Sequence, residues 1–234
     1  NIAEVGIFKV DADGVVLNNI NFIKATNHAV IVNGERCVIN NSHFYNNIYN
    51  SRDMHANGPA VYWDGTDGTI DNSVFENNHI SERESNHYDS GGAVCWMADN
   101  GVIKNSNFTN NAAFNGGAIT WGRTNGEDGC PIVKPKKGTI DNCIFIGNYV
   151  DKSPGASGNT YWAGAVHWFG PDGTIKHSIF DHNRAGWTGA IKVDDDAVNM
   201  KIFDCNFTFN EAYHPNEGSA GAVEMMADNA TIYD

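Results

Sequence analysis

Residues 91 to 111 read GGAVCWMADNGVIKNSNFTNN, and Gly116-Gly117-Ala118 begins the same pattern again. Three features follow one another in this stretch: a Gly-Ala-Val start, an Asn-Gly turn before an apolar residue, and Phe-x-x-Asn. All three recur along the chain, and the short β-branched runs between them follow one another too closely for helices. Internal repeats of this kind define an architecture. The stretch is therefore one unit of a repeat.

The copies can be followed from these three signatures. The first strand of the unit begins at His28-Ala29-Val30, Pro59-Ala60-Val61, Gly92-Ala93-Val94, Gly117-Ala118-Ile119, Gly164-Ala165-Val166, Gly189-Ala190-Ile191 and Gly221-Ala222-Val223. The second strand carries Leu17, Ile39, Ile70, Ile103, Ile140, Ile175 and Ile202. Phe-x-x-Asn begins at Phe44, Phe75, Phe108, Phe145, Phe180 and Phe207, with Phe22 as a degenerate first copy. The pattern predicts an all-β parallel solenoid of about seven and a half coils, each with three short strands.

The turns and corners of the unit also repeat. Asp-Gly or Asn-Gly pairs, which tolerate positive φ, precede the second strand at 13–14, 33–34, 67–68, 100–101 and 172–173. An Asn column follows the second strand at 19, 41, 72, 105 and 142, with His177 and Asp204 in its last two copies. We expect each Asn column to lie at an inward-turning corner and to hydrogen-bond from coil to coil.

Stacking explains why such a unit must repeat. A single coil cannot bury its own apolar face, whereas stacked coils build a continuous core in which like residues form ladders. Side chains alternate with period two, so the inward residues of the first strand are expected to be Trp63, Trp96, Trp121, Trp168, Val193 and Met225. We interpret the tryptophans as a structural ladder rather than a ligand platform.

Composition and charge exclude several classes of protein. The net charge of −13 and the pI of about 4.9 disfavour binding to nucleic acid or to anionic lipid. No run approaches the roughly 20 apolar residues of a membrane helix, and no secretion signal begins the chain. The five cysteines have irregular spacing and no metal pattern, which favours small buried hydrophobes over disulfides.

Insertions lengthen some coils at defined places. They fall at 79–90, 122–137, 149–161 and 211–219, and all of them border the face that carries the first strand. Both ends of the chain stop inside the pattern. We therefore expect residues 1–234 to form a single domain that is a fragment of a longer surface protein.

The pairing of Gly-Gly-Ala-[Ile/Leu/Val] with Phe-x-x-Asn resembles the repeat of the polymorphic outer-membrane proteins. It is also similar to the repeats of adhesin-like surface proteins of methanogenic archaea, which the Asn- and Asp-rich composition favours. Gly91-Gly92-Ala93-Val94 and Phe108-Thr109-Asn110-Asn111 carry the likeness. The resemblance implies a right-handed, single-stranded parallel β-helix, an extracellular location at the cell surface, and adhesion to a glycan or protein of another cell.

The candidate binding site lies on the outward face of the first strands. Its outward column contains Tyr62, Cys95, Thr120, His167, Lys192 and Glu224, and Tyr161, Trp162 and Trp187 come just before the first strand. Bordered by the insertions, this face is expected to form a long, shallow groove in which aromatic rings stack on sugars. The alternative is an ordinary solvated sheet face with aromatic residues packed under loops.

Two other functions compete with a non-catalytic adhesin. Parallel β-helix folds include polysaccharide lyases and hydrolases, and a glycosidase needs two carboxylates across the scissile bond. Asp194-Asp195-Asp196 is the one dense acidic run, with Lys192 beside it, but a solvated turn explains it. We therefore expect no catalytic residues. The other alternative is a rigid structural stalk that projects another domain.

The sequence gives weaker indications of cofactors and modifications. No cofactor is expected, although acidic loops at Asp64/Asp67 or Glu127/Asp128 could hold Ca²⁺. The nine histidines lack zinc spacing. N-glycosylation sequons occur at Asn40, Asn107, Asn206 and Asn229, and those at Asn107 and Asn206 are expected to face outward. We expect a monomer without nucleic-acid partners and without direct membrane insertion.

Overall fold

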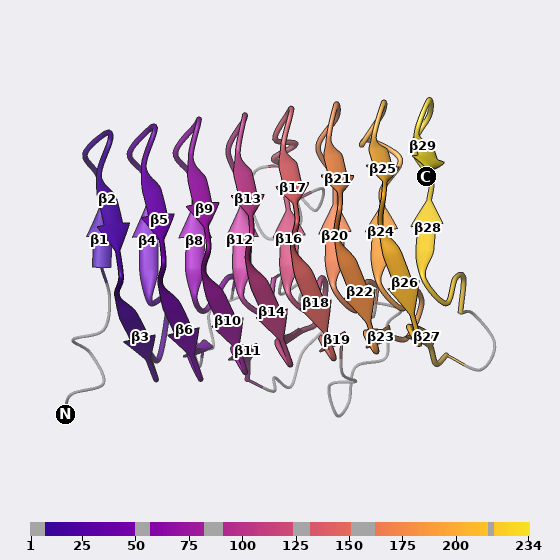
Figure 1. The fold of residues 1–234 in the computed structure, drawn as a ribbon, viewed down its shortest axis with the longest axis horizontal. Helices are drawn as coiled ribbons and strands as arrows, with labels where there is room; N and C mark the ends of the chain where they lie inside the picture. Colours follow the sequence, from indigo (N-terminus) through magenta and orange to yellow (C-terminus); the bar gives the residue numbers. More distant parts are fainter. Residues whose placement is uncertain (1–7, 50–56, 82–90, 124–131, 151–161, 215–217) are drawn as a thin grey trace.

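The computed structural model describes residues 8–49, 57–81, 91–123, 132–150, 162–214 and 218–234. Short parallel strands stack in sequence order into an elongated solenoid, from β1 at one end to β28 and β29 at the other (Figure 1). No helix occurs among these residues. The predicted all-β parallel solenoid, with about seven coils, is confirmed.

Two eight-stranded sheets run the length of the stack. The first sheet contains β1 (Phe8–Val10), β4 (Val30–Val32), β8 (Val61–Trp63), β12 (Val94–Trp96), β16 (Ile119–Trp121), β20 (Val166–Trp168), β24 (Ile191–Val193) and β28 (Val223–Met225). The second contains β2 (Val16–Asn18), β5 (Val38–Asn40), β9 (Thr69–Asp71), β13 (Val102–Lys104), β17 (Thr139–Asp141), β21 (Thr174–Lys176), β25 (Lys201–Phe203) and β29 (Thr231–Tyr233).

Two further sheets complete the coil. The third contains β3 (Asn21–Ile23), β6 (His43–Tyr45), β10 (Val74–Glu76), β14 (Asn107–Thr109), β18 (Ile144–Ile146), β22 (Ile179–Asp181) and β26 (Asn206–Thr208). The fourth contains the two-residue strands β7 (Ile48–Tyr49), β11 (His79–Ile80), β15 (Ala112–Ala113), β19 (Tyr149–Val150), β23 (Arg184–Ala185) and β27 (Glu211–Ala212). The prediction of three strands per coil is wrong, because a fourth strand follows Phe-x-x-Asn.

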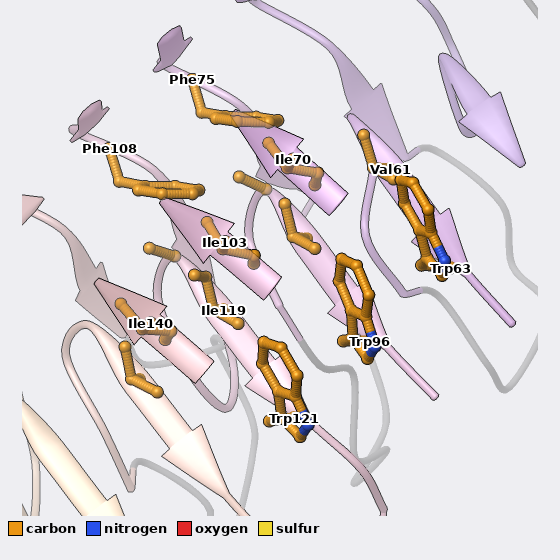
Figure 2. Packing of buried hydrophobic residues seen from close by; sticks show 14 of the residues in the cluster. Val61, Trp63, Ile70, Phe75, Trp96, Ile103, Phe108, Ile119, Trp121 and Ile140 are labelled. Carbon is orange, nitrogen blue, oxygen red and sulfur yellow. The ribbon is translucent and has the colours of Figure 1, made fainter. Parts of the chain in front are cut away.

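Aromatic and aliphatic ladders fill the interior (Figure 2). The indoles of Trp63, Trp96, Trp121 and Trp168 stack with ring centroids 4.6, 4.9 and 4.5 Å apart, and all four are fully buried. The Phe rings stack likewise, for example Phe75 on Phe108 at 4.7 Å. Such close contact between flat rings in consecutive coils fixes the register. The structural tryptophan ladder is confirmed.

The glycines that begin the first strand have two distinct reasons. Gly91 has a φ of +71°, a conformation that side chains disfavour. Gly92 has no positive φ, but a Cβ there would overlap the Gly117 carbonyl of the next coil and the Ala112 backbone. The Gly-Gly pair therefore permits both a tight turn and close packing between coils.

The Asn of Phe-x-x-Asn forms a buried amide ladder. In each coil the side-chain Nδ2 donates to the Oδ1 of the next Asn, as from Asn78 to Asn111 at 2.9 Å and from Asn111 to Asn148 at 3.0 Å. The same Nδ2 of Asn111 donates to the Phe75 carbonyl, and its Oδ1 accepts the backbone N–H of Asn78. All hydrogen-bonding positions of the amide are used, which allows it to be buried.

The other Asn column differs from the expectation. Its members, from Asn19 to Asp204, are exposed and adopt positive φ of 44° to 58°. Several still bond between coils, as Asn142 Nδ2 does to Asn105 Oδ1 at 2.8 Å. The prediction of an inward-turning corner is wrong here, because a left-handed residue turns the chain outward and Asn tolerates that conformation.

The turns before the second strand have the expected positive φ, except at Asn33-Gly34. At 67–68, 100–101 and 172–173 the positive φ belongs to the Asp or Asn and not to the Gly. Asn33-Gly34 lies at a different corner, which corresponds to Asp64-Gly65 in the next coil. The backbone N–H of Asn33 donates to the Val10 carbonyl, and that of Asp64 donates to the Val32 carbonyl in the same way. The glycine after the turn serves the core instead: a Cβ on Gly101 would overlap the indole of Trp96.

The four described cysteines carry free thiols, as predicted. Cys37, Cys95 and Cys143 are buried and Cys205 is partly buried. Cys143 stands where neighbouring coils place Ser106 and Ser178. Burial raises the pKa of Cys95 and of Cys143 to about 12, so neither is a reactive thiolate. Cys130 lies outside the described residues.

Candidate functional site

The strand register aligns the predicted outward column of the first sheet. Consecutive partners are Tyr62, Cys95, Thr120, His167, Lys192 and Glu224. The middle of this column is not open to solvent: Cys95, Thr120 and His167 are 0% exposed and Lys192 is 6% exposed. The long, open groove expected from the sequence is therefore absent at these four positions.

Side chains of the described residues account for part of this covering. The ring of Phe169 lies 4.0 Å from that of His167, and the edge of Trp162 meets the same imidazole at 5.3 Å. Thr120 Oγ1 donates to the Asn115 carbonyl at 3.0 Å. The outward face of the first sheet therefore carries a second layer of packing, and its polar residues require partners within the protein.

A histidine and an aspartate form the first such partnership. His167 Nε2 donates to Asp194 Oδ2 at 3.3 Å, so the neutral ring carries its proton on Nε2 and its Nδ1 is a hydrogen-bond acceptor. That Nδ1 is buried and has no hydrogen-bond partner among the described residues. Burial lowers the pKa of His167, although the bond to Asp194 partly opposes this. The imidazole is therefore neutral at physiological pH.

Asp194 is the ionised member of this pair. Burial on its own would raise the pKa of Asp194, but the hydrogen bond from His167, the side-chain hydrogen bond with Asp195 and the charge of Lys192 lower it to about 2. The Asp194 side chain is 15% exposed, whereas that of His167 is 0% exposed. The carboxylate therefore presents negative charge at the rim of the buried face.

Lys192 and Glu224 form the second partnership. Lys192 Nζ lies 3.3 Å from Glu224 Oε2, 2.9 Å from the thioether of Met226 and 5.7 Å from the ring centre of Trp162. Glu224 Oε2 also accepts from Thr188 Oγ1 at 2.6 Å. We call Trp162, His167, Thr188, Lys192, Asp194 and Glu224 the polar cluster. It spans three consecutive strands, β20, β24 and β28.

The two tryptophans before the first strand occupy equivalent places in neighbouring coils. Ala163, which follows Trp162, pairs with Thr188, which follows Trp187. Both indoles are partly exposed. Trp187 packs against Val150 and Ala185, while Trp162 packs against the polar cluster. Tyr161 lies outside the described residues.

The remaining predicted site residues do not join the cluster. Tyr62 is partly exposed on β8, three strands from β20, with its ring 5.4 Å from His28, and Thr120 is fully buried. The structure thus brings together Trp162, His167, Lys192 and Glu224 and leaves Tyr62 and Thr120 apart. It adds Asp194, which the sequence suggested to be a solvated turn, and Thr188. Only the register of β20 on β24 shows that Asp194 meets His167.

The other suggested sites are less organised. Among the described residues no group of three or more His, Cys, Asp or Glu could hold a metal ion. Asp64 is exposed as a residue, and partial desolvation of its carboxyl raises the pKa. Glu127 and Asp128 lie outside the described residues. Asn107 and Asn206 are exposed on β14 and β26, as expected for their sequons, and Asn229 is exposed as well.

We expect acid to destabilise the fold through its buried histidines. Burial lowers the pKa of His167 and of His28, whose Nδ1 donates to the Gly58 carbonyl at 3.0 Å. The unfolded chain then binds protons first, so stability is complete above the ordinary pKa of 6.5 and is lost as the pH falls below it. Each histidine contributes up to about 1.4 kcal/mol per pH unit.

Urea unfolding between about pH 8 and pH 5 would measure this dependence. His167→Gln should have a shallower slope than the wild type, because the variant retains only the contribution of His28. The lowered pKa of Asp194 predicts a further loss only below pH 3.8. Equal slopes for the variant and the wild type would show that His167 is not linked to unfolding.

Comparison with known proteins adds no relative. No family model matches the chain, and no curated protein sequence matches it. Within the described part of the chain, no helix is long and apolar enough to span a membrane. The function is therefore argued from the geometry of the site.

Proposed function

We propose that this chain is a non-catalytic binding domain of an extracellular, cell-surface adhesin, and that it engages a glycan through the outer face of the first sheet. The observation that carries the proposal is that the residues of the interior ladders and the exposed residues of the site are different. Repeated Trp, Phe and Asn side chains pack in the interior ladders, whereas Trp162, Asp194 and Glu224 lie outside the ladders and are partly exposed together.

The chemistry of this exposed group suits a sugar. Trp162 and Trp187 offer apolar ring faces in adjacent coils, which lie about 4.8 Å apart along the stack. Asp194 and Glu224 supply acceptors beside those rings. Recognition sites combine a mostly apolar surface with a few placed polar groups. The resemblance of the repeat to surface adhesins supports the same reading.

Substitution of Trp162 tests the proposal. Trp162→Ala should weaken binding on a glycan array, and to whole cells carrying the captured glycan, by at least about ten-fold, or about 1.4 kcal/mol. The matched control is Phe209→Ala, which removes a ring that is 77% exposed and lies elsewhere on the solenoid. Far-ultraviolet circular dichroism would verify that both variants are folded. Equal binding by both variants, or no glycan bound by the wild type, would refute the proposal.

A polysaccharide lyase or hydrolase is the second candidate, and one observation favours it. The neutral His167 beside Asp194, next to the pair of Lys192 and Glu224, joins possible acids and bases on one face. The complete burial of His167 favours binding over catalysis, since a base must reach its substrate. Release of reducing or unsaturated ends from a polysaccharide panel, abolished in His167→Gln, would establish the enzyme instead.

A further inference from the structure

The charge of the polar cluster and its neighbours is unbalanced. Among the described residues, Asp194, Asp195, Asp196 and Glu224 are accompanied by two cations, Lys192 and Lys134. Lys134 is paired with Asp196 at 2.6 Å, and Lys192 is paired with Glu224. The hydrogen bond and charge of Asp194 raise the pKa of Asp195, as expected where negative charge accumulates. A second negative group brought to this surface would be repelled.

The cluster also has more unused hydrogen-bond acceptors than unused donors. The side chain of Lys192 is only 8% exposed, and its ammonium already contacts Glu224, Met226 and Trp162. Thr188 donates its hydroxyl proton to Glu224. The groups with spare capacity at the surface are the carboxylate oxygens of Asp194 and Glu224, which are acceptors, whereas the Nδ1 of His167 is fully buried and beyond the reach of a ligand. Such a surface requires a ligand that donates hydrogen bonds.

We propose that the polar cluster, with Trp162 and Trp187, selects neutral, hydroxyl-rich glycans and rejects glycans that carry uronate, sialate or sulfate groups. This inference rests on the proposed function and names the ligand class of the same site. Sugar hydroxyls and N-acetyl N–H groups donate to the free acceptors, and the apolar faces of pyranose rings stack on the indoles. Among the described residues no free cation faces the cluster, so an anionic sugar would add negative charge without a partner.

Titration calorimetry with matched hexasaccharides tests the selectivity. The probes are mannohexaose, cellohexaose and chitohexaose as neutral chains, and hexagalacturonate as the anionic chain. Low ionic strength preserves charge repulsion, and EDTA removes divalent cations that could bridge two carboxylates. At least one neutral chain should bind about ten-fold or more tightly than hexagalacturonate.

Charge-removing variants provide the second arm. Asp195→Asn/Asp196→Asn should narrow the ratio of neutral to anionic affinity by about three-fold or more, because it removes repulsion at the cluster. The control Asp13→Asn makes the same kind of substitution at one position at the far end of the stack. It should leave the ratio of neutral to anionic affinity unchanged. Hexagalacturonate binding as tightly as the neutral chains would overturn the selectivity alone. Failure of all four probes to bind would overturn the proposed glycan site together with the selectivity.

Discussion

Gly101→Val is expected to destabilise the solenoid by about 1–3 kcal/mol, because a side chain at this position would overlap the indole of Trp96. Gly101 has no positive φ, so the backbone itself accepts valine and the cost arises from packing. Trp96→Val alone should cost about 3 kcal/mol or more, since it leaves a cavity between Trp63 and Trp121. Urea unfolding of both variants gives the two values.

The double variant Trp96→Val/Gly101→Val should be more stable than the sum of the single changes predicts. The added valine occupies space that the lost indole vacates, so we expect a coupling of about 1–3 kcal/mol. The chain already contains such exchanges: the coils with Val10, Val32 and Val193 in the ladder have larger residues than Gly at the turn. Those residues are Val15, Cys37 and Met200. Strict additivity would show that turn and ladder are not complementary.

The same exchange explains how far the sequence could predict the fold. An apolar residue at the position of Trp96, and the residue types of Ile103, Phe108 and Asn111, recur in nearly every coil. This repetition revealed the strands, the core and the number of coils. Whether Gly101 follows the turn for reasons of φ or of packing cannot be read from repetition. Both explanations place glycine there, and only the contact with Trp96 separates them.

The fourth sheet was missed for a different reason. Its strands have two residues each and their first residues differ widely in type, as Ile48, Ala112 and Arg184 show. A strand of two residues has no measurable periodicity, and it exists because the buried Asn ladder holds the following backbone in register. For example, Ala112 donates to the Asn78 carbonyl, and Tyr149 to the Asn111 carbonyl.

The alignment of the candidate site residues in one column could be predicted, but their burial and their pairing could not. Alternation along the first strand placed His167, Lys192 and Glu224 on one outward face, and the register agrees. Their burial depends on side chains that the three repeated signatures do not include, such as Trp162 and Phe169. The sequence therefore located the polar cluster without showing that its buried polar groups are paired with each other.

The Asn ladder should be the most sensitive element of the fold, and Asn111→Leu measures its contribution. The change leaves the backbone N–H and the Nδ2 of Asn78, and the carbonyl of Phe75, without the partner they have in the wild type. Each buried group that loses its partner costs about 1–3 kcal/mol, and we expect a total loss of about 3–5 kcal/mol. Leucine fills a similar volume, so cavity formation adds little.

Asn107→Leu is the matched control, because Asn107 lies on the same strand, β14, and is exposed. It should change the free energy of unfolding by no more than about 0.5 kcal/mol. In a solenoid each coil interacts chiefly with its neighbours, so hydrogen exchange should accelerate most at the backbone N–H groups of Asn78 and Asn111 and least at β1 and β28. A loss below about 1 kcal/mol for Asn111→Leu, or uniform exchange along the stack, would mean that the amide ladder satisfies its own polar groups without stabilising the coils.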